Sequence, residues 1–126
     1  MLKGIQQVSI KGLLCRNGKV LVLRTPKRKY WELPGGRIDY AEKAEKAFER
    51  EMREELGFKN VKLGKFINIW SFTSKRNRVD YHFIILDFLI STDETDIKLS
   101  EEHTEYKWVG KKEISKLKMR AGHKES

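Results

Sequence analysis

Three glutamates in one short segment are placed for metal chemistry. Glu51, Glu54 and Glu55 lie in a stretch whose apolar residues recur at helical spacing. Those apolar residues are Ala44, Ala47, Phe48, Met52 and Leu56. At 3.6 residues per turn they form one stripe, which is the face expected to pack on a sheet. Glu51 and Glu55 fall inside this stripe and Glu54 lies at its edge, so the glutamates interrupt a face that packing alone would keep apolar.

Packing does not explain carboxylates at these positions. Like charges four residues apart on a helix repel, and a buried carboxylate is costly unless it is paired or bound to a metal. Oxygen donors without clustered histidine or cysteine favour a hard ion such as Mg²⁺ or Mn²⁺. The alternative is an ordinary acidic helix whose glutamates pair with Lys46, Arg50 and Arg53.

The spacing around the glutamates narrows this choice. Five residues separate Gly36 from Glu42, and seven more lead to the run Arg50-Glu51-Met52-Arg53-Glu54-Glu55-Leu56-Gly57-Phe58. The whole segment resembles the Nudix box, G-x5-E-x7-R-E-U-x-E-E-x-G-U with U apolar, at every specified position. The flanking Trp31-Glu32-Leu33-Pro34-Gly35-Gly36 and the later Trp108-Val109 also resemble the family. The resemblance therefore spans most of the chain.

The resemblance to the Nudix family implies a fold and a metal site. The fold would be of the α/β class, an α/β/α sandwich with a mixed β-sheet, in which the box forms a loop, a helix and a second loop. Glu51 and Glu55 would be the main ligands of Mg²⁺ or Mn²⁺. Glu54 and the backbone carbonyl of Gly35 would be further ligands, and a glycine pair allows that close backbone approach.

The implied reaction is attack of water on a diphosphate linkage. Metal would lower the pKa of the water, and a glutamate would remove its proton. Within the box, the catalytic candidates are Glu54 and Glu51, with Arg50 orienting the glutamates through ion pairs. Glu42 would be mainly structural, because an acid in the first helical turn is favoured by the helix dipole.

A further carboxylate is expected from the acidic segment at 100–108. This segment resembles the part of Nudix proteins that often donates one, with Glu102 as the first candidate and Glu105 as the second. The alternative is a solvated acidic loop.

Substrate selection would come from residues outside the box. The aromatic candidates for stacking on a nucleobase are Tyr30, Trp70, Phe72 and Tyr81, with core packing as the alternative for each. Arg37 directly follows the glycines and is placed to reach a phosphate. The basic candidates for outer phosphates are Lys27, Arg28, Arg76 and Arg78, with a solvated surface as the alternative.

The elements that must position these residues follow from hydrophobic pattern and turn signals. We expect strands over 5–15, 20–24, 61–73, 79–90 and 106–109. Asn17-Gly18 predicts a hairpin turn, and the basic segment 74–78 a loop. The central helix is expected from Tyr40 to Leu56, with Asp39 and Glu42 as a capping box and Gly57 as its end. A short helix is expected over 111–119, within a single domain of residues 1–119, followed by a frayed tail at 120–126.

The net charge and the apolar content of the chain indicate which partners it can bind. The 126 residues carry a formal net charge of +9, which suits polyanions such as nucleotides, RNA or an anionic membrane surface. No segment approaches the length of a membrane span, so no membrane partner is expected. The single cysteine, Cys15, lies in an apolar run, which predicts a buried thiol, and a cytosolic setting follows as the default. A nucleotide is the expected substrate; nucleic acid is a less favoured partner, and a homodimer stays open.

Together the patterns favour a metal-dependent hydrolase of a nucleoside diphosphate derivative. The short chain, without a proline after the box, favours a small MutT-like nucleoside triphosphate pyrophosphohydrolase that releases monophosphate and pyrophosphate. Dinucleoside polyphosphates, ADP-ribose and RNA 5′ ends remain alternatives. A Nudix module that binds nucleotide or RNA without cutting it is the alternative from another class; the retained box glutamates count against it.

Overall fold

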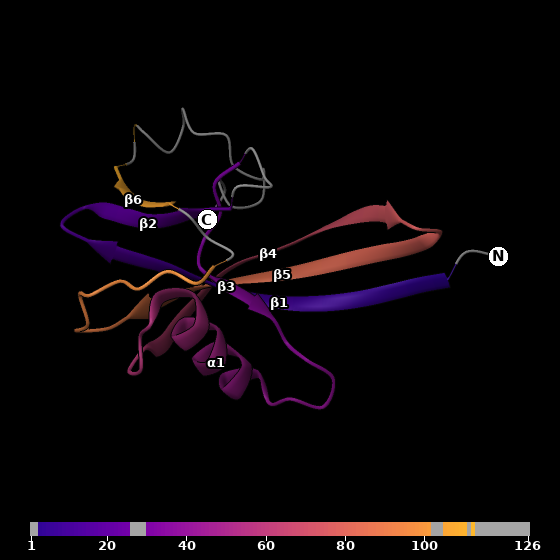
Figure 1. The fold of residues 1–126 in the computed structure, drawn as a ribbon, viewed down its shortest axis with the longest axis horizontal. Coiled ribbons are helices and arrows are strands. Elements are labelled where there is room, and N and C mark those ends of the chain that lie inside the picture. Colours follow the sequence, from indigo (N-terminus) through magenta and orange to yellow (C-terminus); the bar gives the residue numbers. More distant parts are fainter. Residues whose placement is uncertain (1–2, 26–29, 102–104, 111, 113–126) are drawn as a thin grey trace.

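One helix packs against a mixed sheet in the computed structural model, which describes residues 3–25, 30–101, 105–110 and 112 (Figure 1). The elements in chain order are β1 (Lys3–Arg16), β2 (Lys19–Arg24), β3 (Gly35–Arg37), α1 (Ala44–Leu56), β4 (Lys62–Arg76), β5 (Val79–Ser91) and β6 (Glu105–Val109). In the described part of the chain, no helix is long and apolar enough to cross a membrane.

The strands run in the order β4-β5-β1-β2-β6, and β3 pairs with β1 off this path. β1 and β5 are parallel over twelve register positions, from Lys3 with Val79 to Leu14 with Ile90, and the other pairs are antiparallel. The predicted α/β class with a mixed sheet is confirmed. The helix expected over 111–119 and the tail at 120–126 lie outside the described residues, apart from Lys112.

Two tight turns determine where β1, β2, β4 and β5 begin or end. Asn17 and Gly18 have φ values of 51° and 73°, as the predicted tight turn between β1 and β2 requires. Asn77 and Arg78 have φ values of 49° and 64°, so the turn between β4 and β5 is also only two residues long. The predicted loop over 74–78 is therefore wrong for residues 74–76, which continue β4 although they are polar.

The helix begins later than its capping pattern predicted. α1 starts at Ala44, with Lys43 as an N-cap whose side chain makes no capping hydrogen bond. Ala41 has a φ of 63°, which breaks the helical path between Asp39 and Lys43. The Glu42 side chain still accepts a hydrogen bond from the Asp39 N–H at 3.0 Å, so the capping contact closes a turn before the helix. Gly57 ends α1 in the left-handed conformation, as predicted.

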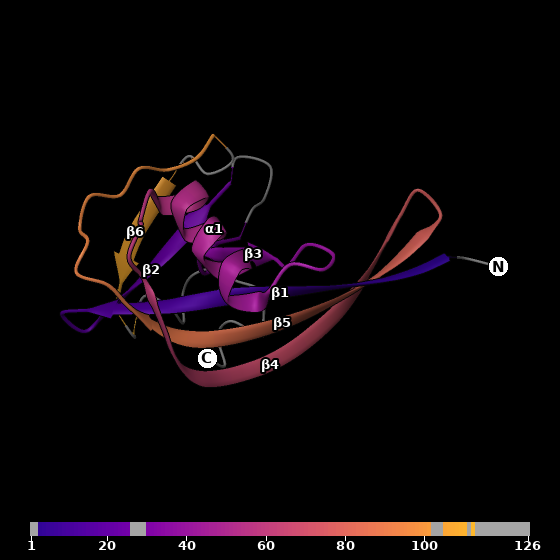
Figure 2. The same ribbon diagram turned by 90° about the horizontal axis from the view of Figure 1, so that it is seen from below.

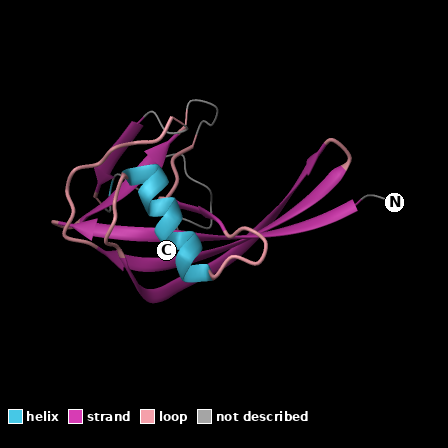
Figure 3. Cartoon of the chain, turned by 60° about the horizontal axis from the view of Figure 1, so that its bottom comes forward, coloured by secondary structure: helices cyan, strands magenta, loops and turns pink. Residues whose placement is uncertain are grey.

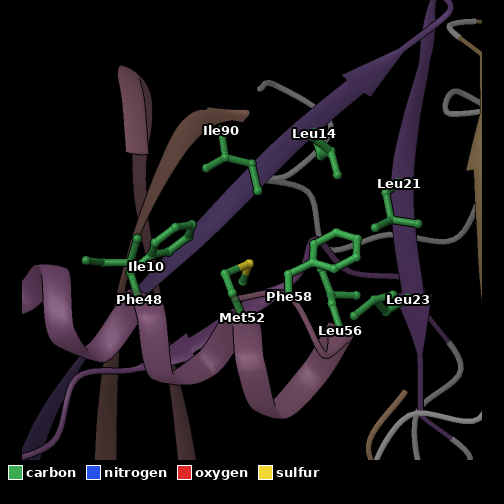
Figure 4. Packing of buried hydrophobic residues seen from close by; sticks show 9 residues of the cluster. All are labelled: Ile10, Leu14, Leu21, Leu23, Phe48, Met52, Leu56, Phe58 and Ile90. Carbon is green, nitrogen blue, oxygen red and sulfur yellow. The ribbon is translucent and has the colours of Figure 1, made fainter. Parts of the chain in front are cut away.

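The main hydrophobic core lies between α1 and the sheet (Figure 4). Its buried residues are Ile10, Leu14, Leu21, Leu23, Phe48, Met52, Leu56, Phe58 and Ile90. Val22 belongs instead to a second cluster with Trp31, Leu33 and Val109, so β2 is buried on both faces. Cys15 is exposed, contrary to the expected buried thiol. Leu14 takes the core position, and strand alternation turns the next side chain away from it.

β1, β4 and β5 extend well past α1 and form a three-stranded arm (Figures 1 and 2). The arm ends at the β4–β5 turn, and the N-terminal end of β1 lies beside it. α1 crosses the sheet at the other end, next to β3 (Figure 3). The molecule therefore has a layered body, which holds the helix and the glycine pair, and an arm made of sheet alone.

Candidate active site

The glycine pair of β3 meets the glutamate face of α1. Gly35 and Gly36 pair with Lys11 and Ile10 of β1, which fixes β3 at the centre of the sheet. A methyl group at Gly36 would lie 2.4 Å from the Glu51 Cδ atom, so the Glu51 carboxylate rests directly on the glycine backbone. Gly35 has a φ of 135°, and a methyl group there would lie 2.1 Å from the Ile10 carbonyl oxygen. Only glycine fits both positions without displacement.

Glu55 is buried at the same place. Its exposure is 6%, and its Oε2 atom accepts a hydrogen bond from the Gly35 N–H at 3.1 Å. Glu51, one turn earlier, is half-buried. Burial raises the pKa of the Glu51 carboxyl, and its hydrogen bond with Arg50 partly offsets this rise. Two carboxylates that packing would disfavour are thus held beside one backbone segment.

Arg50 organises the acidic residues around the helix. Its Nε and Nη2 atoms donate to the two carboxylate oxygens of Glu42, each at 2.9 Å, and Nη1 donates to Glu51 at 2.9 Å. Nη1 also lies 3.4 Å from the exposed Glu54, and Nη2 donates to the Arg37 carbonyl at 3.0 Å. The Arg50 hydrogen bonds, followed by the Asp39 N–H, lower the pKa of Glu42 to about 2. The same pairing, led by Glu42, raises the pKa of Arg50.

Lys11 of β1 completes the site and was missed from the sequence. Its Nζ atom donates to the Gly35 carbonyl oxygen at 3.0 Å. This is the oxygen that the box resemblance assigned to the metal. The available signal was a lysine between Ile10 and Gly12, directly before the apolar run Leu13-Leu14-Cys15. The sequence did not show that β3 would pair with β1 at this residue.

The other charged residues predicted for the site have the following positions. Arg37 is exposed, and its Nε atom lies 3.7 Å from the Asp39 Oδ1 atom. Glu105 forms an ion pair with Arg24 at the β2–β6 edge. Glu102, Lys27 and Arg28 lie outside the described residues.

The aromatic candidates form a row on the arm. Trp70 stacks on Phe72, Phe72 on Phe83, and Phe83 on Tyr81, with ring centroids 5.0–5.7 Å apart. All four are half-buried, and Trp70 donates to Asp87 at 3.0 Å. The Arg76 guanidinium lies 5.6 Å from the Phe83 ring. Tyr30 is half-buried and precedes the buried Trp31. Phe83, which was not a candidate, links the two strands of this row.

The geometry agrees with an independent family match. A family model described as the NUDIX domain matches residues 6–126. The chain belongs to the Nudix hydrolase family. In Nudix terms, the loop-helix-loop of the box runs from Gly36 through α1 to Phe58 and places Glu51 and Glu55 against Gly35 and Gly36.

Several Nudix proteins resemble the chain over most of its length. Nucleoside triphosphatase NudI of Klebsiella pneumoniae is 30% identical over 99 residues, which are 72% of this chain and 69% of that protein. The match spans 60% of NudI of Escherichia coli O81. An 8-oxo-dGTP diphosphatase of Buchnera aphidicola is 29% identical over 102 residues, 78% of this chain and 72% of that protein. The crystal structure of a MutT protein from Methanosarcina mazei Go1 has a TM-score of 0.76 and 27% identity, covering 98% of this chain and 91% of that one.

The donors at this Nudix site are all oxygens. Among the described residues, no three acidic, histidine or cysteine side chains come together as a ready metal-binding group. The oxygens that do gather are the carboxylates of Glu51 and Glu55 and the carbonyl of Gly35. Such a set suits a hard divalent cation, and the Lys11 ammonium shows that the carbonyl oxygen is open to a positive charge. The residues present therefore fit the divalent metal that the family implies.

Proposed function

We propose that this chain is a metal-dependent pyrophosphohydrolase that cuts nucleoside triphosphates into monophosphate and pyrophosphate. One observation carries the proposal: a buried and a half-buried carboxylate from one helix face meet a glycine backbone that has no side chain to shield it. Burying negative charge at this cost is expected where a cation and an anionic substrate bind together.

Each residue of the site has a distinct role in this proposal. Glu51, Glu55 and the Gly35 carbonyl would hold Mg²⁺ or Mn²⁺, and Glu54 would be a further ligand from the same helix. When bound, the metal would neutralise the diphosphate oxygens and lower the pKa of the attacking water. Arg50 would act as a positioning residue, because its donors are used within the protein. A box glutamate would accept the proton of the water; Glu54 is the best exposed of the three.

The substrate class is supported by the relatives. Two of them bear the names nucleoside triphosphatase and 8-oxo-dGTP diphosphatase, and both names point to a nucleoside triphosphate substrate. Arg37 would meet an outer phosphate, because it follows Gly36 and is exposed. The base would lie toward the aromatic row, which includes Tyr81, with Tyr30 as a further contact.

A nucleotide panel with separate detection of phosphate and pyrophosphate tests the proposal. Turnover should require Mg²⁺ or Mn²⁺, stop with excess chelator, and release pyrophosphate. Glu55→Gln should lower kcat by about 100-fold or more, because the neutral amide keeps the Gly35 hydrogen bond but removes a metal-binding charge.

Glu49→Gln is the matched control, since Glu49 is an exposed glutamate of the same helix that pairs with Lys46 at 3.5 Å. It should keep full activity. Turnover that persists in chelator would refute the metal requirement, and release of inorganic phosphate alone would refute the bond that we assign.

A further inference from the structure

Lys11 is a cation that contacts the glycine segment of the site. It lies in β1 between two pairing partners, Gly35 on β3 and Asp87 on β5. Asp87 is fully buried, and the Lys11 side chain is partly buried. The charge of Lys11 offsets a small part of the rise that burial causes in the pKa of the Glu51 carboxyl. The ammonium therefore rests on the glycine segment, on the side of Glu51.

Lys11 and Arg50 differ in how many of their donors the protein uses. All three nitrogen atoms of Arg50 donate to carboxylates or to a backbone carbonyl. The Lys11 ammonium has three N–H groups, and within the described residues it makes one hydrogen bond, to the Gly35 oxygen. Two donors therefore remain for another acceptor. Arg50 is committed to the protein, whereas Lys11 is equipped to bind a ligand.

The oxygen that Lys11 holds is one that a metal would need. We propose that Lys11 is a substrate-binding residue whose ammonium rests on the Gly35 carbonyl in the metal-free protein and moves to the phosphate chain of the substrate when that oxygen is used for metal binding. The inference rests on the proposed function and deepens it. A displaced ammonium beside a divalent cation is repelled by it, and phosphate oxygens are the acceptors that relieve this repulsion.

This placement has two measurable consequences. Without nucleotide, Lys11 opposes metal binding, because its charge and its hydrogen bond both compete for the site. With nucleotide, Lys11 favours binding, because a compact ammonium contacts phosphate oxygens as a point charge. Removing the charge of a merely structural lysine would not strengthen metal binding and weaken nucleotide binding at the same time. The site should therefore prefer substrates with several phosphates over monophosphates.

The test compares Lys11→Met with Lys19→Met. Methionine keeps the length of the side chain and removes its charge. Lys19 is an exposed lysine of β2, and its pairing partner Arg16 is five residues, about 16 Å, along β1 from Lys11. Mn²⁺ affinity without nucleotide is measured by paramagnetic resonance titration. Steady-state kinetics with a nucleoside triphosphate follow at saturating metal, and thermal unfolding verifies that each variant is folded.

We expect Lys11→Met to bind Mn²⁺ about 3–10-fold more tightly and to lose about 10–100-fold in kcat/KM, mostly through KM. Lys19→Met should match the wild type in both. An unchanged KM in a folded Lys11→Met variant would overturn the phosphate role, and unchanged or weaker Mn²⁺ binding would overturn the resting position on Gly35. If the wild type hydrolysed no nucleotide, the proposed function would fail, but the Mn²⁺ titration would still test where Lys11 rests.

Discussion

Glu42 and Arg50 show how one ion pair can serve a site without taking part in its chemistry. Glu42 receives two hydrogen bonds from Arg50, each at 2.9 Å, and a third from the Asp39 N–H. This arrangement ties the turn before α1 to the middle of the helix. Arg50 then holds Glu51 from the same guanidinium. The segment that carries the glycines and the helix that carries the glutamates are therefore joined by Arg50.

The pKa of Glu42 gives this pair a testable pH dependence. The pKa falls from an ordinary 4.5 to about 2 in the folded protein, chiefly because of the Arg50 hydrogen bonds. A depressed carboxyl pKa stabilises the fold above the ordinary value, and this contribution is lost as pH falls from about 4.5 to about 2. Glu42→Gln should thus lower the unfolding temperature by a few degrees at pH 7, and the deficit should shrink across that window.

Thermal unfolding of both proteins from pH 7 to pH 2.5 measures this difference. Glu45→Gln is the control, because Glu45 is an exposed acid of the first helical turn. It should show a smaller deficit at neutral pH. A Glu42→Gln deficit that stays constant down to the lowest pH would contradict the ionic origin of the pairing.

Some site residues were predictable at this scale and others were not. Glu51 and Glu55 followed from helical periodicity, because a helix fixes which residues share a face. Lys11 did not, because the site depends on which strand lies beside the glycine pair. That pairing joins residues 24 positions apart and is set by the sheet. The contact between Arg50 and Glu42 bridges a non-helical turn that helical spacing could not describe.

At the scale of elements, the three-residue strand β3 provides the backbone against which Glu51 and Glu55 lie. Its two glycines are needed for different reasons. At Gly35 a methyl group would collide with the backbone of β1, and φ is positive, so substitution strains the sheet. At Gly36 the three atoms nearest to an added methyl group all belong to the flexible end of Glu51. The first glycine supports the fold, and the second makes room for a carboxylate.

This difference predicts two distinct variants. Gly36→Ala should keep its unfolding temperature within a few degrees and lose about tenfold or more in kcat/KM, because Glu51 must move. Gly35→Ala should be destabilised by about 1–3 kcal/mol. Gly4→Ala, with nothing within 4 Å of the added methyl group, serves as the control for both measurements. A fully active Gly36→Ala variant would show that the position of Glu51 is not important for activity.

The strand and helix limits show what local patterns can and cannot predict. Asn17-Gly18 predicted its hairpin because the turn needs positive φ at both residues. The second hairpin, at Asn77-Arg78, was missed because polar residues 74–76 looked like a loop, yet pairing with β5 extends β4 through them. The early start predicted for α1 was wrong for a different reason. The Asp39–Glu42 contact forms, but the positive φ of Ala41 interrupts the helical path between these residues and Ala44.

At the scale of the whole molecule, the positive charge is unevenly placed relative to the site. Lys75, Arg76 and Arg78 lie at the tip of the arm (Figure 1). Arg76 pairs with Val79, which is eight residues along β5 from Asp87, the partner of Lys11. Eight strand residues span about 26 Å. The arm tip is therefore beyond the phosphates of a nucleotide held at β3, and a longer polyanion would be needed to engage both regions.

The salt dependence of binding distinguishes a single nucleotide from an RNA strand as the ligand of these positive charges. A bound RNA strand would release many counterions, so its affinity would fall steeply with salt, whereas a single nucleotide engages few charges. We expect kcat/KM for a nucleoside triphosphate to fall only about two- to threefold between 50 and 200 mM salt. We expect any binding of a short single-stranded RNA to be weak and steeply salt-sensitive.

The matched variant replaces Lys75 and Arg78 together with glutamine and keeps Arg76, which lies against Phe83 of the aromatic row. It removes two exposed charges from the arm tip and leaves the residues at β3 and α1 unchanged. Nucleotide kinetics should be the same as in the wild type at every salt concentration, while the salt slope of RNA binding should become shallower by about one to two units. Parallel titrations of both proteins with a triphosphate and with RNA measure these slopes. If RNA stayed tightly bound at physiological salt and nucleotides were turned over poorly, the charge on the arm would belong to the substrate site, and an RNA 5′ end would replace the free nucleotide as the substrate.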